Sequence, residues 1–250
     1  MPDVVTYTVV ADACGRGRRW DMALQLLQVM RQHLVEADGM FFTVLLTACR
    51  PSAEWRQAVG LLGAMTGASY KTGVEHFGAA MSVCELARRW EWALVLLASM
   101  QAVQLTPNVM CCGSTLSALE KGKQWERALF LLEDMAQWCV FPDVVAYNAA
   151  ISACEKARSW RAAVALLAEM RLKRLVPTLV SYSAAISACE KQRQWGLAMA
   201  LLEEMLESGC GVDALAFHAV VSACEAGEQW ERAIGLLMAM PGLKLSPSTE

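Results

Sequence analysis

The sequence has 250 residues, of which 56% are hydrophobic and 19% charged, and this composition excludes a disordered chain. Its 22 Lys and Arg oppose 25 Asp and Glu, and the net charge of −3 excludes the strongly basic field that is typical of duplex-DNA-binding proteins. Any contact with a nucleic acid must therefore be local.

The predicted elements repeat with a period of 35 residues from the first element onward. In the first period, apolar residues at helical spacing predict helices near residues 5–16 and 20–31, with no strand. Both patterns return in every later period. Helix breakers lie between the two helices of four units and between several units: Gly15, Gly17, Pro51, Gly122 and Gly227 in the first group, and Pro107, Pro142 and Pro177 in the second. The period is kept by Trp at 20, 55, 90, 125, 160, 195 and 230, by Met at 30, 65, 100, 135, 170, 205 and 240, and by Ala at 23, 58, 93, 128, 163, 198 and 233.

These periods divide the chain into seven units of two helices each. The expected boundaries are 4–38, 39–73, 74–108, 109–143, 144–178, 179–213 and 214–248. A two-helix hairpin cannot bury its apolar face alone, so we predict an all-α fold, an α-solenoid of seven stacked 35-residue helix-turn-helix repeats in a single array over residues 1–250. The Trp and Met columns should pack between helices. Because residues 1–3 and 249–250 resemble parts of further units, we expect a window of a longer array.

The longest stretch without charge, residues 92–119, has Pro107 and polar residues near its centre. It predicts a helical hairpin and not a membrane span, so we expect a soluble chain without membrane contact. The first residues contain no recognisable targeting peptide.

Nothing in the sequence indicates catalysis or a metal. Six cysteines share one position of the unit, where the fourth unit has Leu119, so this position selects an apolar group and not a thiolate. The three histidines, His33, His76 and His218, fall at three different positions of the unit. Known nucleophile, phosphate-loop and zinc motifs are missing. We therefore predict no enzyme, no catalytic residue, no metal, no cofactor and no small-molecule substrate.

The fifth unit carries a family resemblance. Val144-Val145-Ala146-Tyr147-Asn148, Ala163, Leu166-Leu167, Met170 and the preceding Pro142-Asp143 resemble the pentatricopeptide repeat, and the strict 35-residue length agrees. The resemblance covers essentially the whole chain, although Trp at the start of the second helix is not the family's commonest choice. It implies a right-handed superhelix in an organelle, chloroplast or mitochondrion, that acts in RNA processing, stability, editing or translation.

The resemblance further implies that single-stranded RNA binds with one nucleotide per repeat. Two residues of each unit would select the base: Thr8 with Asp38, Thr43 with Gly73, Gly78 with Asn108, Gly113 with Asp143, Asn148 with Thr178, Ser183 with Asp213, and His218 with Ser248. Apolar residues would sandwich the bases: Val5, Met40, Met110, Val145, Val180 and Leu215, a series that Glu75 breaks. Cations at the end of the first helix would contact phosphates: Arg16, Lys121, Lys156 and Lys191.

Two alternatives to RNA binding stay open at the level of the sequence. One is a solenoid scaffold that binds other proteins, because selector pairs are weak in four units and a basic field is missing. In that case the terminal cations of the first helices are ordinary solvated charges beside glutamates. The other is a longer protein in which this array only positions a catalytic domain beyond residue 250.

Overall fold

The computed structural model describes residues 2–67, 70, 72–239 and 245–246, which form two compact units, Met1–Gly122 and Lys123–Glu250. The first unit contains α1 (Val4–Arg16), α2 (Trp20–Gln32), α3 (Gly39–Ala48), the short 3₁₀ helix η1 (Arg50–Ser52), α4 (Trp55–Gly67), α5 (Val74–Leu86), α6 (Trp90–Ala102) and α7 (Val109–Lys121). The second unit contains α8 (Trp125–Gln137), α9 (Val144–Lys156), α10 (Trp160–Leu172), α11 (Leu179–Glu190), α12 (Trp195–Glu207), α13 (Ala214–Ala226) and α14 (Trp230–Ala239).

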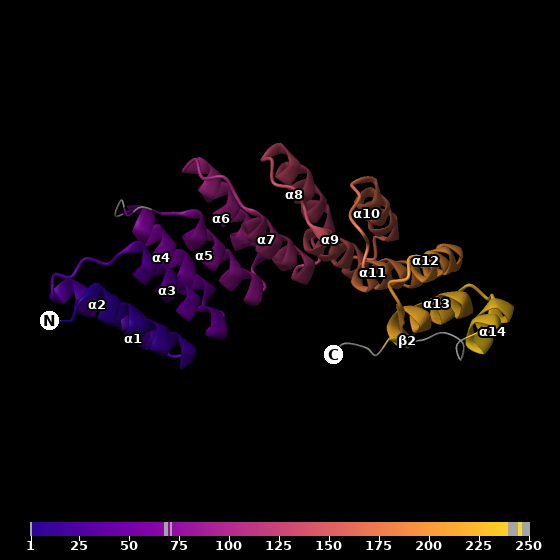
Figure 1. Cartoon of the computed structure of the whole chain (residues 1–250), viewed down its shortest axis with the longest axis horizontal. Helices are drawn as coiled ribbons and strands as arrows, with labels where there is room; N and C mark the ends of the chain where they lie inside the picture. Colours follow the sequence, from indigo (N-terminus) through magenta and orange to yellow (C-terminus); the bar gives the residue numbers. More distant parts are fainter. Residues whose placement is uncertain (1, 68–69, 71, 240–244, 247–250) are drawn as a thin grey trace. The chain divides into compact units, whose positions relative to one another are not determined.

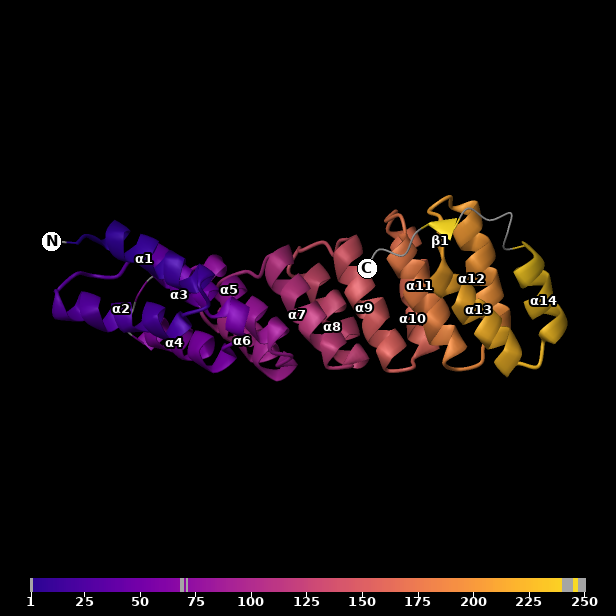
Figure 2. The ribbon, with the colours of Figure 1, turned by 90° about the horizontal axis from the view of Figure 1, so that it is seen from below.

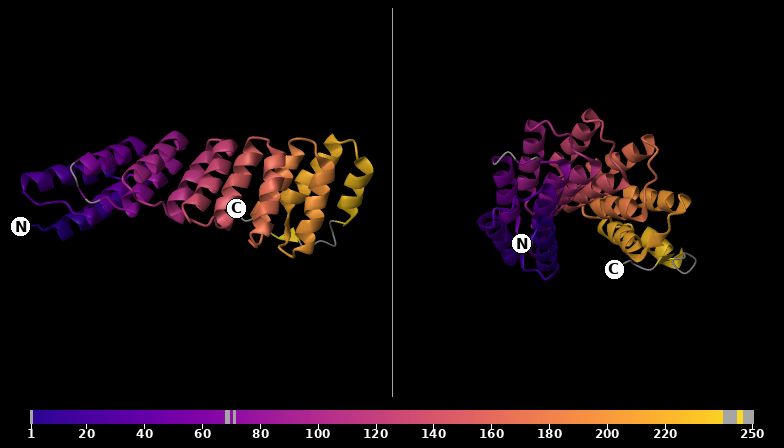
Figure 3. Two further views of the ribbon diagram at one scale, coloured as in Figure 1. Left: turned by 90° about the horizontal axis from the view of Figure 1, so that it is seen from above. Right: turned by 60° about the vertical axis from the view of Figure 1, so that its left-hand side comes forward.

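Each of the two units is built from helical hairpins in two layers. The odd-numbered helices, called first helices below, pack side by side, and the even-numbered second helices form the other layer (Figure 1). Figures 2 and 3 show the same two layers from other sides within each unit. The predicted all-α solenoid fold is therefore confirmed, and the predicted helices of the first period differ from α1 and α2 by one residue at most. A single array over residues 1–250 stays a prediction.

One expectation was wrong, because the described residues include two short strands. β1 (Val212–Asp213) pairs in parallel with β2 (Leu245–Ser246). The residue before each first helix has an extended backbone, as Asp213 does with φ −93° and ψ 162°. Extended residues present unpaired N–H and C=O groups, and here a later segment of the chain bonds to them.

The periodic residues form the core, as predicted. The Met column is fully buried from Met30 to Met205, and the Ala column is buried from Ala23 to Ala198. The tryptophans are only half-buried, and Trp230 is 65% exposed. A Cβ built on Gly122 or Gly227 would meet the indole of Trp90 or Trp195, so these rings cover the C-terminus of the next first helix. The Trp column therefore packs between repeats at the rim of the core.

The turn between the two helices of each hairpin contains a residue in the left-handed conformation. The φ angle lies between 53° and 61° at Arg18, Ala53, Arg88, Lys123, Arg158, Arg193 and Glu228. A second left-handed position follows several second helices, at Leu34, Gln104, Cys139 and Arg174, and the equivalent residue after α12 is Gly209 with φ 69°. These positions end one helix and redirect the chain into the next.

Burial keeps four of the six periodic cysteines protonated. It raises the thiol pKa of Cys49 and Cys189 to about 11 and of Cys84 and Cys154 to about 12, from 9.0. Because a thiolate is needed for alkylation, we expect these four thiols to resist iodoacetamide in the folded chain at pH 8, while exposed Cys139 reacts quickly. Mass spectrometry of the labelled peptides measures this.

The same shifts predict a loss of stability in alkali. Unfolding lets the thiols ionise near pH 9, so their contribution to stability is complete below pH 9 and is lost as the pH rises toward 11–12. Equal labelling of Cys84 and Cys139 in the native protein would contradict this picture of the core.

Candidate functional site

The face formed by the first helices carries a column of exposed apolar side chains. They stand at the second residue of the unit and are 55–71% exposed: Val5, Met40, Met110, Val145, Val180 and Leu215. Glu75 takes this position in the third unit and is also exposed. Side chains of the opposite helix face, such as Tyr147, Ile151 and Cys154, are fully buried, as predicted. These aliphatic groups are not part of the core, and their exposed methyl groups can pack against the faces of planar ligands.

The first residue of each predicted selector pair lies on the same face, three residues further along the helix. Thr8 and Thr43 donate their hydroxyl hydrogens to Val4 and Gly39 of their own helices, at 2.8 Å and 3.0 Å. Gly113 has open space where a Cβ would be, and His218 is exposed on α13. The other member of the last pair, Ser248, lies outside the described residues.

In the first six pairs, the second residue has a structural role that the sequence analysis missed, because it is the N-cap of the next first helix. Through Oδ1, Asp38 accepts from Phe41 N at 2.8 Å, Asn108 from Cys111 N at 2.9 Å, and Asp143 from Ala146 N at 2.8 Å. Gly73 stands at the same place before α5. The Asp or Asn followed by an apolar helix was the available signal. Capping occupies Oδ1 and leaves the other end of the side chain for a ligand.

Two selector pairs are in direct contact. Asn148 Nδ2 donates to Thr178 Oγ1 at 3.3 Å, and Ser183 Oγ donates to Asp213 Oδ1 at 3.3 Å. Asp213 also caps α13 by accepting from Ala216 N at 2.8 Å. In these two repeats, the two residues of the predicted pair are therefore in side-chain contact.

A hollow of about 280 Å³ lies over the second of these pairs. It is lined by Val180, Ser183, Asp213 and Leu215, together with Glu155, Leu179, Ala184 and Ser187. Two apolar side chains from successive repeats thus flank a hydroxyl and a carboxylate. A planar ring with hydrogen-bond donors on its edge fits this arrangement, because the faces meet methyl groups and the edge meets acceptors.

The cations at the end of the first helices are already paired. Lys121 Nζ lies 2.9 Å from Glu85 Oε1, and Lys191 Nζ lies 2.6 Å from Glu155 Oε1. Each glutamate belongs to the preceding first helix and also accepts from a serine, Ser117 at 2.8 Å or Ser187 at 3.1 Å.

The other two predicted phosphate-binding cations are Arg16 and Lys156. Arg16 forms a salt bridge with Asp12 at 2.6 Å within α1, and Lys156 ends α9. Glu85 and Glu155 therefore bind the cation of the next repeat.

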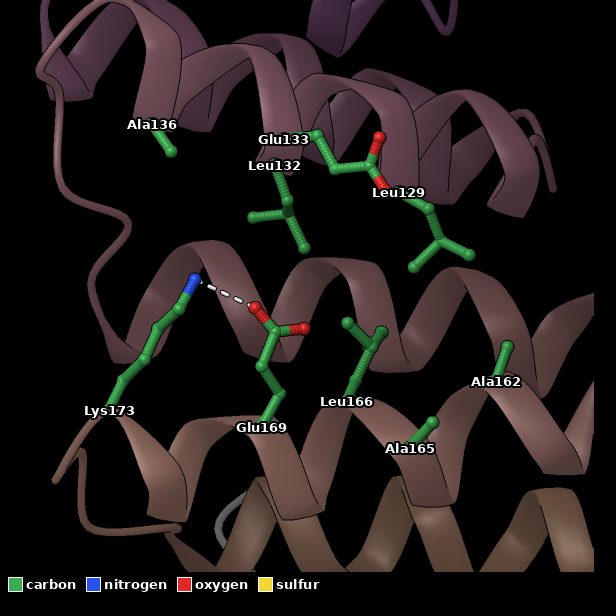
Figure 4. Close-up of a pocket in the computed structure, with 9 residues that line it drawn as sticks. All are labelled: Leu129, Leu132, Glu133, Ala136, Ala162, Ala165, Leu166, Glu169 and Lys173. Atoms are coloured by element: carbon green, nitrogen blue, oxygen red, sulfur yellow. Dashed lines mark ion pairs between the residues drawn. The ribbon is translucent and has the colours of Figure 1, made fainter.

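The second helices of the Lys123–Glu250 unit form a separate groove of about 440 Å³ between α8 and α10 (Figure 4). Leu132 and Leu166 line it together with Glu133 and Glu169. Lys173 Nζ lies 2.7 Å from Glu169 Oε1. Burial opposes the ionised form of Glu169, but hydrogen bonds from Lys173 and Tyr147 outweigh it and lower the pKa of this carboxyl. The groove is open and largely apolar, with charges at one end.

Within the described part of the chain, no cluster of three or more His, Cys, Asp or Glu side chains is arranged to hold a metal ion. None of the helices described is both long enough and apolar enough to span a bilayer.

The stacked hairpins and their ligand-accessible face define a helical-repeat protein of the α-solenoid class. The PPR repeat family model matches residues 142–191, and the PPR repeat model matches residues 5–33 and 180–210. These matches identify pentatricopeptide repeats in both units of the chain and confirm the resemblance seen in the sequence.

Solved structures share this fold. Pentatricopeptide repeat protein PPR10 from maize is 18% identical with a TM-score of 0.62, over 98% of this chain and 40% of that one. PPR10 in complex with an 18-nt psaJ RNA element is 17% identical with a TM-score of 0.57, over 97% of this chain and 40% of that one. The PPR domain of Arabidopsis thaliana protein-only RNase P 1, in complex with tRNA, is 16% identical with a TM-score of 0.54, over 64% of this chain and 85% of that one.

The chain thus spans about two fifths of the length of the PPR10 chains. Comparison with curated proteins gives no match.

Proposed function

We propose that this chain binds single-stranded RNA along the face of its first helices, with one nucleotide per repeat. The observation that carries the proposal is the hollow in which Val180 and Leu215 flank the Ser183–Asp213 pair. Family membership supports it, as do fold relatives solved with RNA, PPR10 with an RNA element and the RNase P domain with tRNA.

Base stacking on the exposed aliphatic column supplies affinity that does not depend on sequence. The selector pairs supply specificity through the base edge. Asp213 and Asp38 offer carboxylate oxygens to the N–H groups of guanine, so the first and sixth repeats prefer G. Asn148 offers a carboxamide, so the fifth repeat prefers a pyrimidine. Gly78, Gly113 and exposed His218 leave their repeats with little discrimination.

In this proposal the chain acts in chloroplast or mitochondrial RNA metabolism and is itself no enzyme. Phosphates of the RNA approach the terminal cations of the first helices, where they compete with Glu85 and Glu155 for Lys121 and Lys191. This competition and the net charge of −3 give weak binding with a clear dependence on salt.

Fluorescence anisotropy with labelled RNA tests the proposal. The purified chain should bind a single strand with G, pyrimidine and G at the first, fifth and sixth places more tightly than a strand with these bases changed, and more tightly than the matching duplex. Equal affinity for all of these, or no binding at low salt, would refute RNA recognition by this face.

Removing the competing carboxylate should strengthen binding. We expect Glu155→Gln to free Lys191 for a phosphate, so that affinity for every single strand rises and the slope of log K against log salt steepens by about one. Lys191→Ala should have the opposite effect, with a slope shallower by about one. The Lys191 and Glu155 side chains are 35% and 20% exposed, so solvent screens the pair and limits the cost to folding. Unchanged slopes in both variants would show that phosphates do not reach this place.

A second candidate function is a protein-binding scaffold, favoured by the groove between α8 and α10 (Figure 4). Ala165→Arg would place a charge at an exposed position of the groove, away from the first-helix face. Loss of a protein partner with unchanged RNA binding would support the scaffold, and unchanged partner binding would exclude this groove.

A further inference from the structure

Three side chains from two successive repeats form a closed ring of hydrogen bonds at the fifth selector pair. Asn148 Nδ2 donates to Thr178 Oγ1 at 3.3 Å, the oxygens of Thr178 and Ser181 lie 3.2 Å apart, and Ser181 Oγ donates to Asn148 Oδ1 at 2.5 Å. The ring is complete when Thr178 donates to Ser181, because the serine hydrogen is already used. Every hydroxyl hydrogen of the ring then has an acceptor.

The distances fix the direction of the carboxamide. A separation of 2.5 Å lies at the short end of the range of O–H···O bonds and below the range of N–H···O bonds, whereas the longer 3.3 Å contact is a weak bond from the amide. Oδ1 therefore faces Ser181, and Nδ2 lies on the side of Thr178. Since Nδ2 has two hydrogens and the ring uses one, a single amide N–H is left for a ligand.

Ser181 is held more firmly than the residues it orients. Its side chain is 0% exposed, while Asn148 and Thr178 are half-buried. Its Oγ also accepts from the backbone N–H of Thr178 at 2.9 Å, which anchors it to the start of α11. The serine is thus a rigid buried support beneath the pair.

The position of Ser181 has an equivalent in another repeat. The third residue of a first helix lies beneath the fifth residue of the preceding unit, as Cys111 does beneath Gly78, where an added Cβ would meet Cys111 Sγ at 3.5 Å. Cys111 has no selector side chain to orient, and Ser181 has one. The support is therefore specific to the repeat that contains Asn148.

We propose that Ser181 is a positioning residue for base recognition by the fifth repeat: it locks the Asn148 carboxamide so that a fixed N–H faces the base. The inference rests on the proposed function, because the ligand is the RNA base. Without the serine hydroxyl, the carboxamide can turn over and exchange its donor for its acceptor, which costs selectivity and not affinity for the strand as a whole.

The experiment compares Ser181→Ala, Ser181→Cys and Ser181→Thr in the full chain. Cysteine keeps most of the volume but is a weak donor, and threonine keeps the hydroxyl. Affinities are measured for four labelled RNAs that differ only in the fifth base. We expect the ratio of pyrimidine to purine affinity to fall about 3- to 10-fold for Ala and Cys, as loss of one neutral hydrogen bond predicts, and to persist for Thr.

A control and a second readout separate positioning from folding. Thr115 is another fully buried hydroxyl, which donates to Cys111 O of its own helix at 2.9 Å, so Thr115→Val should leave the fifth-base ratio unchanged. In the RNA-free protein, NMR should show slow exchange of the Asn148 amide hydrogens in the parent and fast exchange in Ser181→Ala.

The outcomes distinguish the two proposals. A parent that discriminates and a Ser181→Ala variant that discriminates equally would overturn the positioning role and leave RNA binding intact. A parent protein without any preference at the fifth base would overturn both the positioning role of Ser181 and base selection by the fifth repeat. Fast exchange of the Asn148 amide in the parent would overturn the locked carboxamide whatever the RNA does.

Discussion

Asn148→Thr combined with Thr178→Asp is expected to move the preferred fifth base from a pyrimidine to guanine, with the first and sixth preferences unchanged. The reason is chemical: the new pair copies Thr8 with Asp38, which offers a carboxylate to the N–H groups of guanine. A good pair of base contacts discriminates by about 1–3 kcal/mol, or roughly 5- to 150-fold in relative affinity. Anisotropy titration of RNAs that differ only at the fifth place measures the change.

The structure makes this exchange mild for the fold. The aspartate introduced in place of Thr178 would stand where Asp38, Asp143 and Asp213 already cap the following helix, so the start of α11 keeps its cap. The threonine introduced in place of Asn148 can donate to its own helix backbone, as Thr8 and Thr43 do. Asn148→Thr alone is the matched control. If the double variant retains the pyrimidine preference of the parent, base selection does not reside in this pair.

Tyr147→Ala should lower the free energy of unfolding by about 3–5 kcal/mol, since it removes a large and fully buried ring. The loss should be local: each repeat is stabilised mainly by its neighbours, so hydrogen exchange should accelerate in α9, α10 and α11 and stay unchanged in α1 to α3. Denaturant titration and hydrogen exchange by mass spectrometry measure the two effects.

Tyr147→Phe separates the ring from its hydroxyl. The hydroxyl donates to Glu169 Oε1 at 2.8 Å, and its loss should cost about 1.5–3 kcal/mol, because one hydrogen bond to a charged group at the edge of the core disappears. Uniform acceleration of exchange from α1 to α13 in Tyr147→Ala would be inconsistent with stability held between neighbouring repeats.

The fold was predictable because one pattern is repeated without insertion. Apolar spacing placed α1 and α2 to within one residue, whereas α3 ends three residues before the repeated pattern predicts. The same spacing separates buried Tyr147 from exposed Val145. Pro51 also signalled the break that shortens α3 and leaves the 3₁₀ helix after it. A periodic pattern of this kind predicts burial within one helix well, because burial depends on which face of the helix a residue occupies.

The contacts between repeats were not predictable in the same way. They join residues 30–36 positions apart, as with Lys191 and Glu155 or Ser181 and Asn148, and the helical period does not say which side chains of neighbouring helices meet. The half-buried state of Trp90 and Trp195 had the same cause, because these indoles lie over the next repeat. The capping role of Asp38 and its equivalents was readable, but base selection offered a competing explanation of the same residues.

The left-handed residues of the hairpin turns affect both the stability of the fold and the net charge of the protein. A residue with a Cβ costs about 1–2 kcal/mol in this conformation, and glycine would avoid the cost, as Gly209 does at the other left-handed position. Five of the seven turns nevertheless hold an exposed cation: Arg18, Arg88, Lys123, Arg158 and Arg193. Glycine at these positions would relieve the strain and make the fold more stable to heat. It would also remove five positive charges from a protein of net charge −3. Replacing these cations with glycine would therefore raise thermal stability and at the same time weaken the electrostatic attraction of the protein for anions.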